Sequence, residues 1–217
     1  MVGFVVNCCI HNYSDCCFCR SLYFRNDALM DHFFERLIQI PKLYGTIVVL
    51  VYSILVSEYI SSINKLFMTR GIEITSILKT FMQLNFVMTI LSGIVVWIVL
   101  CLLFHLTALL FNGKAIFGRF LIAASYPYVI PAIVVFIAIL MLENVEVPDT
   151  DDIVQILKQN NRFQFIVNMV NYSFIPYYLI VSWIIHHLYR LKYPYAMLSV
   201  AVPICTIWGV TELFKLI

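Results

Sequence analysis

Five runs with few or no charged residues follow one another along the chain, separated by more polar stretches. Each run is close to the roughly 20 apolar residues that an α-helix needs to cross the hydrocarbon core of a bilayer. The pattern therefore predicts an all-α, polytopic integral membrane protein. We expect its five transmembrane helices at about Leu43–Ile60, Phe86–Phe111, Phe120–Leu142, Phe163–Ile185 and Tyr195–Phe214.

Three segments outside these spans are also expected to be structured. Asp31–Ile40 is amphipathic, which suits a helix lying at the membrane interface. Ser61–Gln83 has apolar residues at mostly helical spacing, with Gly71 as a break, so we expect it to lie along the outer surface or to pack on the bundle. Pro148 opens a short helix that ends at about Asn160. The expected fold is thus five transmembrane helices plus short amphipathic interfacial helices.

The composition agrees with a membrane protein. Apolar residues make up 62% of the 217 residues and charged residues 12%, and the mean hydropathy is +0.92. A soluble domain has about 25% charged residues. The net charge of +2 is too small to indicate a nucleic-acid partner, so the lipid bilayer is the main partner. The length fits one membrane domain, at 31–217, after a cytoplasmic Cys-rich tail, at 1–30, that we expect to be disordered.

Two short basic links set the predicted orientation. The link between spans two and three carries Lys114, and the link between spans four and five carries Arg190 and Lys192, with no acidic residue in either. Because short loops rich in Lys and Arg stay in the cytoplasm, we expect both links and the N-terminus on the cytoplasmic side. The acidic loop Glu143–Arg162 then faces the other side. Basic residues in the first outer loop reduce the asymmetry, but the rule is strongest for short links.

The N-terminal tail holds a cluster of cysteines, at positions 8, 9, 16, 17 and 19, with His11 between them. Their spacing is not that of a paired C-x-x-C zinc site. Reduced thiols in a disordered tail are the favoured interpretation, and a metal site and palmitoylation are the alternatives. Translation from Met30 would omit the tail. Met1–Leu29 does not resemble a cleavable signal peptide.

Motifs for catalysis are missing from the sequence. It contains no Gly-rich phosphate loop, no H-E-x-x-H and no G-x-S-x-G. We expect His186 and His187 to be interfacial residues beside the basic link rather than metal ligands, and His105 to make a hydrogen bond in the core. The aspartates at 149, 151 and 152 suit the first turn of a helix better than a cation site. The prediction is a non-enzymatic protein without cofactor or metal.

Polar residues inside the predicted spans indicate helix contacts. Asn168 and Asn171 are three residues apart on span four and share a helix face. Because an amide in lipid needs a hydrogen-bonding partner, we expect these side chains to bond to other helices. The alternative is a polar cavity for a small ligand or ion. The span centres carry no acidic or basic residue, which weakens the case for an ion-coupled transporter.

A proline-rich segment opens span three. Pro127 and Pro131 are about one helical turn apart, and each removes a backbone donor. In lipid, the freed carbonyl groups must find partners within the protein. We therefore expect a kink that packs against span two.

The stretch from Leu106 to Pro131 resembles the membrane domain of the Yip family, the Ypt/Rab-interacting membrane proteins. The matching residues are Gly113, Lys114, Phe117, Tyr126, Pro127, Tyr128 and Pro131. The resemblance covers about 31–217 and implies a five-span plan with a cytoplasmic N-terminus. Eukaryotic members have a longer N-terminal region, so the chain is more similar to compact members of prokaryotic type. We expect the link and the proline-rich segment, with Asn168 and Asn171, to form a packing surface or a docking surface for partners.

These features favour a non-enzymatic scaffold or accessory factor of the Yip type. Such a protein would bind other membrane proteins in trafficking, export or envelope maintenance. The alternative is a transporter or transport-complex subunit with a polar cavity between spans three to five, and a membrane enzyme acting on lipid ranks last. The expected location is the cell membrane in a prokaryote, or the Golgi or ER membrane in a eukaryote. Assembly as a homo-oligomer is left open.

Overall fold

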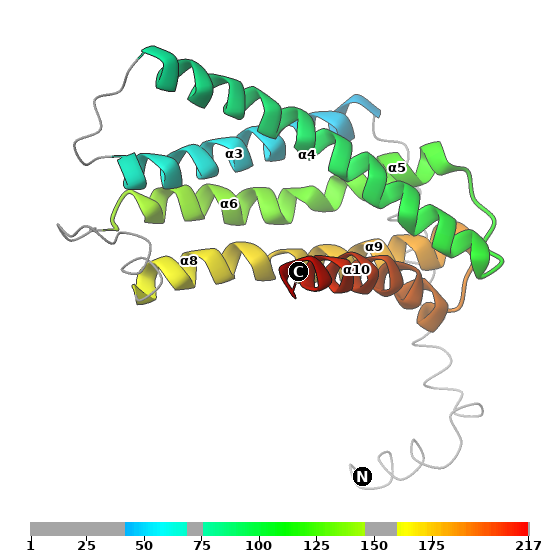
Figure 1. The fold of residues 1–217 in the computed structure, drawn as a ribbon. Coiled ribbons are helices and arrows are strands. Elements are labelled where there is room, and N and C mark those ends of the chain that lie inside the picture. Colours follow the sequence, from blue (N-terminus) through cyan, green and yellow to red (C-terminus); the bar gives the residue numbers. More distant parts are fainter. Residues whose placement is uncertain (1–41, 69–75, 146–159, 217) are drawn as a thin grey trace, which may run out of the picture. The chain divides into compact units, whose positions relative to one another are not determined.

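The computed structural model describes residues 42–68, 76–145 and 160–216, and the regular structure in these ranges is helical throughout (Figure 1). The helices are α3 (Lys42–Met68), α4 (Ser76–Leu110), α5 (Phe117–Ser125), α6 (Val129–Leu142), α8 (Asn161–Tyr172), α9 (Phe174–Tyr189) and α10 (Tyr193–Leu216), with the 3₁₀ turn η1 (Tyr126–Tyr128) between α5 and α6. The cysteine-rich tail, the expected interfacial helix at 31–40, Gly71 and the expected helix after Pro148 lie outside the described residues.

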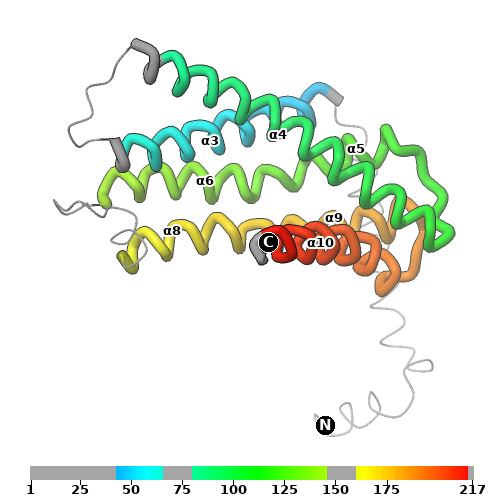
Figure 2. The backbone as a smooth tube through the Cα atoms, in the orientation of Figure 1, coloured from blue at the N-terminus to red at the C-terminus, as the bar shows by residue number. Residues whose placement is uncertain are grey.

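Five stretches in the described ranges are long and apolar enough to cross a membrane. They are Leu43–Lys65, Thr80–Leu110, Phe117–Leu142, Asn161–Tyr189 and Tyr193–Phe214. Each contains most of one predicted span, so the predicted number and order of apolar helices are confirmed. The third stretch joins α5, η1 and α6, and the fourth joins α8 and α9, and Figure 2 shows the continuous backbone through both junctions.

The first span is longer than its uncharged run. α3 continues past Glu58 to Met68, and the Lys65 Nζ atom lies 3.4 Å from a Glu58 carboxylate oxygen, so the two charges pair two turns apart on an exposed side. The expected separate helix at Ser61–Gln83 is wrong where the structure describes it, because 61–68 ends α3 and 76–83 begins α4. Neither part contains Pro or Gly, so nothing in the sequence interrupts the two long helices there.

Four of the described helices lie in a row, and α10 packs against it. Figure 1 shows α4, α3, α6 and α8 side by side in that order, and each neighbouring pair is in contact. α10 packs on α9 and on α4. The two short links, at 111–116 and 190–192, lie at the same end of this arrangement, which we call the link end; the opposite end, where α6 ends and α8 begins, is the far end.

A hydrophobic cluster holds three helices together at the far end. Val135, Ala138 and Leu142 of α6 are buried between Tyr59 of α3 and Ile166 of α8. Inside a bilayer, helix packing is stabilised by van der Waals contact rather than by exclusion of water, and small residues such as alanine allow close approach. The cluster therefore fixes α3, α6 and α8 as one layer.

Two hydroxyl groups connect α4 to its neighbours. Most buried hydroxyls bond to a carbonyl one turn back in their own helix, as Ser53 does to Val49. Ser57 of α3 instead donates to the Phe86 carbonyl of α4 over 2.9 Å. Thr107 of α4 donates to the carbonyl of residue 199 in α10 over 2.6 Å. α4 is thus bonded to α3 toward the far end and to α10 toward the link end.

Candidate functional site

The link between α4 and α5 lies tightly against the end of α9. The backbone N–H of Lys114 donates to the Tyr189 carbonyl over 3.4 Å, and that of Gly113 donates to the Ala108 carbonyl over 3.0 Å. A Cβ atom at Gly113 would lie 2.8 Å from the same Ala108 oxygen and 2.9 Å from a ring carbon of Tyr189. Gly113 is therefore part of a packed joint between three spans, whereas the Lys114 side chain is exposed.

Tyr189 is the centre of this joint. Its hydroxyl lies 2.5 Å from Nδ1 of His105 on α4, so the hydrogen bond predicted for His105 is confirmed. The ring of Phe120 on α5 meets the Tyr189 ring edge-on at 5.6 Å, and the ring of Phe117 lies 5.2 Å from His105. Aromatic pairs at such distances add about 0.5–1.5 kcal/mol each beyond simple burial.

The proline-rich segment does interrupt its helix, but it packs differently from the prediction. Tyr126–Tyr128 forms the 3₁₀ turn, and the Pro127 carbonyl, which lacks its helical donor because Pro131 has no N–H, accepts from Val129 N–H instead. The turn packs mainly on α3 and α9, not on α4. The reason is that α5 makes the contact with α4 and the turn then directs α6 toward α3.

A cluster of tyrosines surrounds this turn. The Tyr128 ring lies 4.6 Å from Tyr177 of α9 and 5.1 Å from Tyr52 of α3, and Tyr177 lies 5.3 Å from Tyr178. Tyr177 is fully buried, and its hydroxyl makes no hydrogen bond to a described residue. Pro127, Tyr128 and Pro131 are buried as well, so this part of the predicted set packs inside the chain.

The described residues bring together no group of three or more His, Cys, Asp or Glu side chains that could hold a metal ion. The ring of His186 bonds through Nδ1 to the Leu191 carbonyl in the second link. This contact agrees with the position predicted for His186 beside the basic link.

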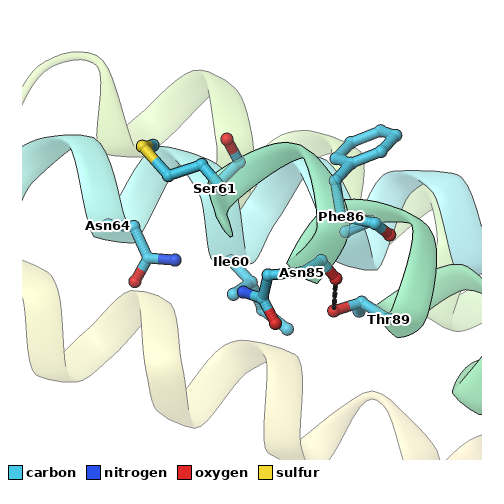
Figure 3. A pocket seen from close by; sticks show the side chains of 8 residues that line it. Ile60, Ser61, Asn64, Asn85, Phe86 and Thr89 are labelled. Carbon is cyan, nitrogen blue, oxygen red and sulfur yellow. Dashed lines mark hydrogen bonds between the residues drawn. The ribbon is translucent and has the colours of Figure 1, made fainter. Parts of the chain in front are cut away.

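A polar cleft lies between α3 and α4 toward the far end (Figure 3). Its lining residues are Ser57, Ile60, Ser61, Asn64, Met82, Asn85, Phe86 and Thr89. In Figure 3, the side-chain amides of Asn64 and Asn85 both point into the gap beside the two helices, while the Thr89 hydroxyl donates to the Asn85 carbonyl over 2.8 Å. The enclosed volume is about 10 Å³, which is room for about one water molecule.

A shallow groove adjoins the cleft. It has a volume of about 320 Å³ and shares Ser61, Met82 and Phe86 with the cleft, so both hollows belong to the same helix pair. The cleft was missed from the sequence because 61–83 was assigned to a separate helix. The signal was present in α3, where Ser57, Ser61 and Asn64 follow the i, i+4, i+7 spacing of one helix face.

Asn168 and Asn171 do not pack between the described helices. α8 buries Ile166 against α6, and both asparagines are exposed on the other side of α8. The prediction that they bond to other helices is therefore wrong for the described helices of a single chain, because the packed face of α8 is the one that carries Ile166.

The described residues define a class, a helical protein with five stretches that are long and apolar enough to cross a membrane. No family model matches the chain, and no curated protein or solved structure is significantly similar to it. The resemblance to the Yip family stays a prediction.

Proposed function

We propose that this protein is a non-enzymatic, multi-pass membrane scaffold of the Yip type, which binds other membrane proteins through contacts between helices. The observation that supports the proposal is the cleft between α3 and α4, where Asn64 and Asn85 direct two amides out of the helix pair (Figure 3). Neither side-chain amide makes a hydrogen bond to a described residue, whereas Ser57 bonds α3 to α4 and Ser53 lies close to Gly93.

The depth of the cleft favours a protein partner near the membrane boundary. Asn85 is five residues inside the span that begins at Thr80, which is about 7 Å at the rise of an α-helix. Leaving a polar side chain without a hydrogen bond in an apolar environment costs about 1–3 kcal/mol. A partner helix with a polar side chain at this depth would satisfy both amides.

The size of the cleft favours a protein-binding function over a transport function. Small-molecule sites usually have volumes of about 300–1,000 Å³ and enclose most of the ligand. The enclosed cleft has only about 10 Å³, and the larger neighbouring hollow is a shallow groove. These dimensions support a contact surface. A transport-complex subunit with a cavity between spans three to five is the second candidate, and no described feature favours it.

The charges at the link end support a cytoplasmic location for that end. Lys114, Arg119, Arg190 and Lys192 are all exposed there, in or beside the two short links. Described acidic residues lie elsewhere, for example Glu143 at the far end. Because short basic loops remain in the cytoplasm, we propose that both links lie on the cytoplasmic side of the membrane. That membrane is the cell membrane in a prokaryote, or the Golgi or ER membrane in a eukaryote.

Labelling from outside tests this orientation. We expect an impermeant thiol reagent applied to intact cells to leave a cysteine at Ile116 unmodified and to modify a cysteine at Asn161, since both side chains are exposed at opposite ends. For a chain in an internal membrane, sealed vesicles with a known side outward replace the cells. After detergent is added, both positions should react. Labelling of Ile116→Cys but not Asn161→Cys in sealed membranes would reverse the proposed topology.

Photocrosslinking in native membranes tests the scaffold function. We expect a photoreactive amino acid at Asn85 to form a discrete adduct with a second polypeptide. The same group at Val95, which is 57% exposed on α4, should react mainly with lipid and serves as the matched control. Replacing Asn64 by leucine should reduce the Asn85 adduct. If position 85 gives only lipid adducts, like position 95, the cleft is not a protein-binding surface and the proposal fails.

A further inference from the structure

The fourth span has one side that packs on the bundle and one side that is exposed. On the packed side, Ile166 and Tyr177 are buried against the rest of the bundle. The open side carries five exposed residues separated alternately by three and four positions. These residues, which we call the open heptad face, are Phe165, Asn168, Tyr172, Ile175 and Leu179. A 3–4 alternation is the spacing by which two helices pack at a small left-handed crossing angle.

Two amides lie on or beside this face, well inside the span. The span begins at Asn161 and has 29 residues, so at 1.5 Å per residue Asn168 is about 10 Å and Asn171 about 15 Å from its end. Both side chains are exposed, and neither bonds to another described residue. In hydrocarbon, no water is present to bond them, so each unsatisfied amide carries a cost that a partner would remove.

The backbone of this face also departs from a regular helix. Pro176 has no N–H, so the Tyr172 carbonyl lacks the donor that it would have in a regular helix. Tyr172 is 65% exposed and lies in the middle of the open heptad face. One regular helical hydrogen bond is therefore missing in the middle of this face.

We propose that the open heptad face pairs with the same face of a second copy of this chain, forming a symmetric dimer within the membrane. Copies in one membrane share the same orientation, so a two-fold axis along the membrane normal brings Asn168 of each copy to the same depth. An asparagine amide has two donors and an acceptor and is therefore complementary to itself. A purely apolar helix would leave it unsatisfied.

The absence of charge on this face and its heptad register are both compatible with a second copy of the chain. Arg162 lies at the end of the span, and residues 163–189 contain no Asp, Glu, Lys or Arg, so the open heptad face itself brings no like charges together. In a parallel heptad pair, Phe165, Tyr172 and Leu179 occupy one core position and face their equivalents. Asn171 then occupies the flanking position that lies beside Pro176 of the other copy, near the carbonyl that Pro176 leaves without a donor.

This dimer goes beyond the scaffold function and uses another surface. The cleft is formed by α3 and α4, and the open heptad face by α8 and α9. Either proposal can therefore fail while the other holds.

Crosslinking of the full-length chain in native membranes tests the dimer. We expect a photoreactive amino acid at Ile175 to give an adduct of twice the 25.2 kDa mass of one chain. The same group at Leu91, which is 53% exposed on α4, should give none. In lipid vesicles, the double variant N168L/N171L should weaken self-association about tenfold, from the loss of interhelical hydrogen bonds.

A matched variant controls for loss of a polar group elsewhere. Thr206 is exposed on α10 and donates to the Val202 carbonyl of its own helix, so Thr206→Val should leave dimerisation unchanged. An adduct of another mass at position 175 would assign the face to a different protein and overturn the dimer. Absence of a protein adduct there, or unchanged dimerisation in N168L/N171L with normal thermal stability in detergent, would also overturn it.

Discussion

Replacing Tyr177 by alanine is expected to lower the free energy of unfolding by about 3–5 kcal/mol, the range for removing a large aromatic ring from a packed core. Tyr177 is fully buried, and its ring meets Tyr128 of the 3₁₀ turn at 4.6 Å and Phe174 at 6.1 Å. The ring therefore fills the space between η1 and α9. Its removal leaves a cavity that rigid neighbouring helices cannot close.

The matched control is Tyr177→Phe. It keeps the ring and removes a hydroxyl that makes no hydrogen bond to a described residue, so we expect stability to be kept or raised, because a buried polar group without a partner costs about 1–3 kcal/mol. Unfolding of the purified protein in mild detergent, followed by circular dichroism, measures both variants. A loss in Tyr177→Phe as large as that in Tyr177→Ala would show that the hydroxyl, not the ring, holds the joint.

The number and order of the apolar helices could be predicted because a span is specified by its own sequence. About 20 apolar residues identify a span whatever surrounds it. The ends of the spans depend on neighbours and were less accurate. α3 continues past Glu58 to Met68, and Lys65, two turns later, pairs with the carboxylate. The predicted span ended at about Ile60 and so did not include Lys65.

The contents of the site depend on contacts between distant residues, which periodicity does not reveal. His105 was expected to make a core hydrogen bond, but its partner Tyr189 is 84 positions away. Asn168 and Asn171 were correctly placed on one face of a helix, yet the sequence could not tell whether that face was packed. The face is exposed, because Ile166 packs the opposite side of α8 against α6.

The proline-rich segment was also predictable only in part. The sequence predicted an interruption of the third span, because Pro127 and Pro131 remove backbone donors. The structure has a 3₁₀ turn there. The direction of the chain after the turn could not be predicted, because it depends on which helix is available to pack. α6 packs on α3 and α8, and this places Tyr128 beside Tyr177.

Gly113→Ala is expected to destabilise the protein by about 1–3 kcal/mol, the usual cost of adding a methyl group to a packed site. The new Cβ atom would lie 2.8 Å from the Ala108 carbonyl oxygen and 2.9 Å from the Tyr189 ring. The oxygen belongs to the backbone of α4, and it already accepts a hydrogen bond from Gly113 N–H, so it cannot move without breaking that bond. The Tyr189 ring is held by Phe120 and by the hydrogen bond to His105.

Gly118 is the control for this change, since it is a nearby glycine at the start of α5 with nothing within 4 Å of the position of an added Cβ. Gly118→Ala should keep or raise stability, by at most about 1 kcal/mol, because alanine is the better helix former. Thermal unfolding in detergent compares the two variants. A contact-based effect requires Gly113→Ala to melt well below the wild type while Gly118→Ala does not. Equal melting temperatures for the two variants would mean that the link is free to move away from α9, and the joint around Tyr189 would then not depend on the close approach of Gly113.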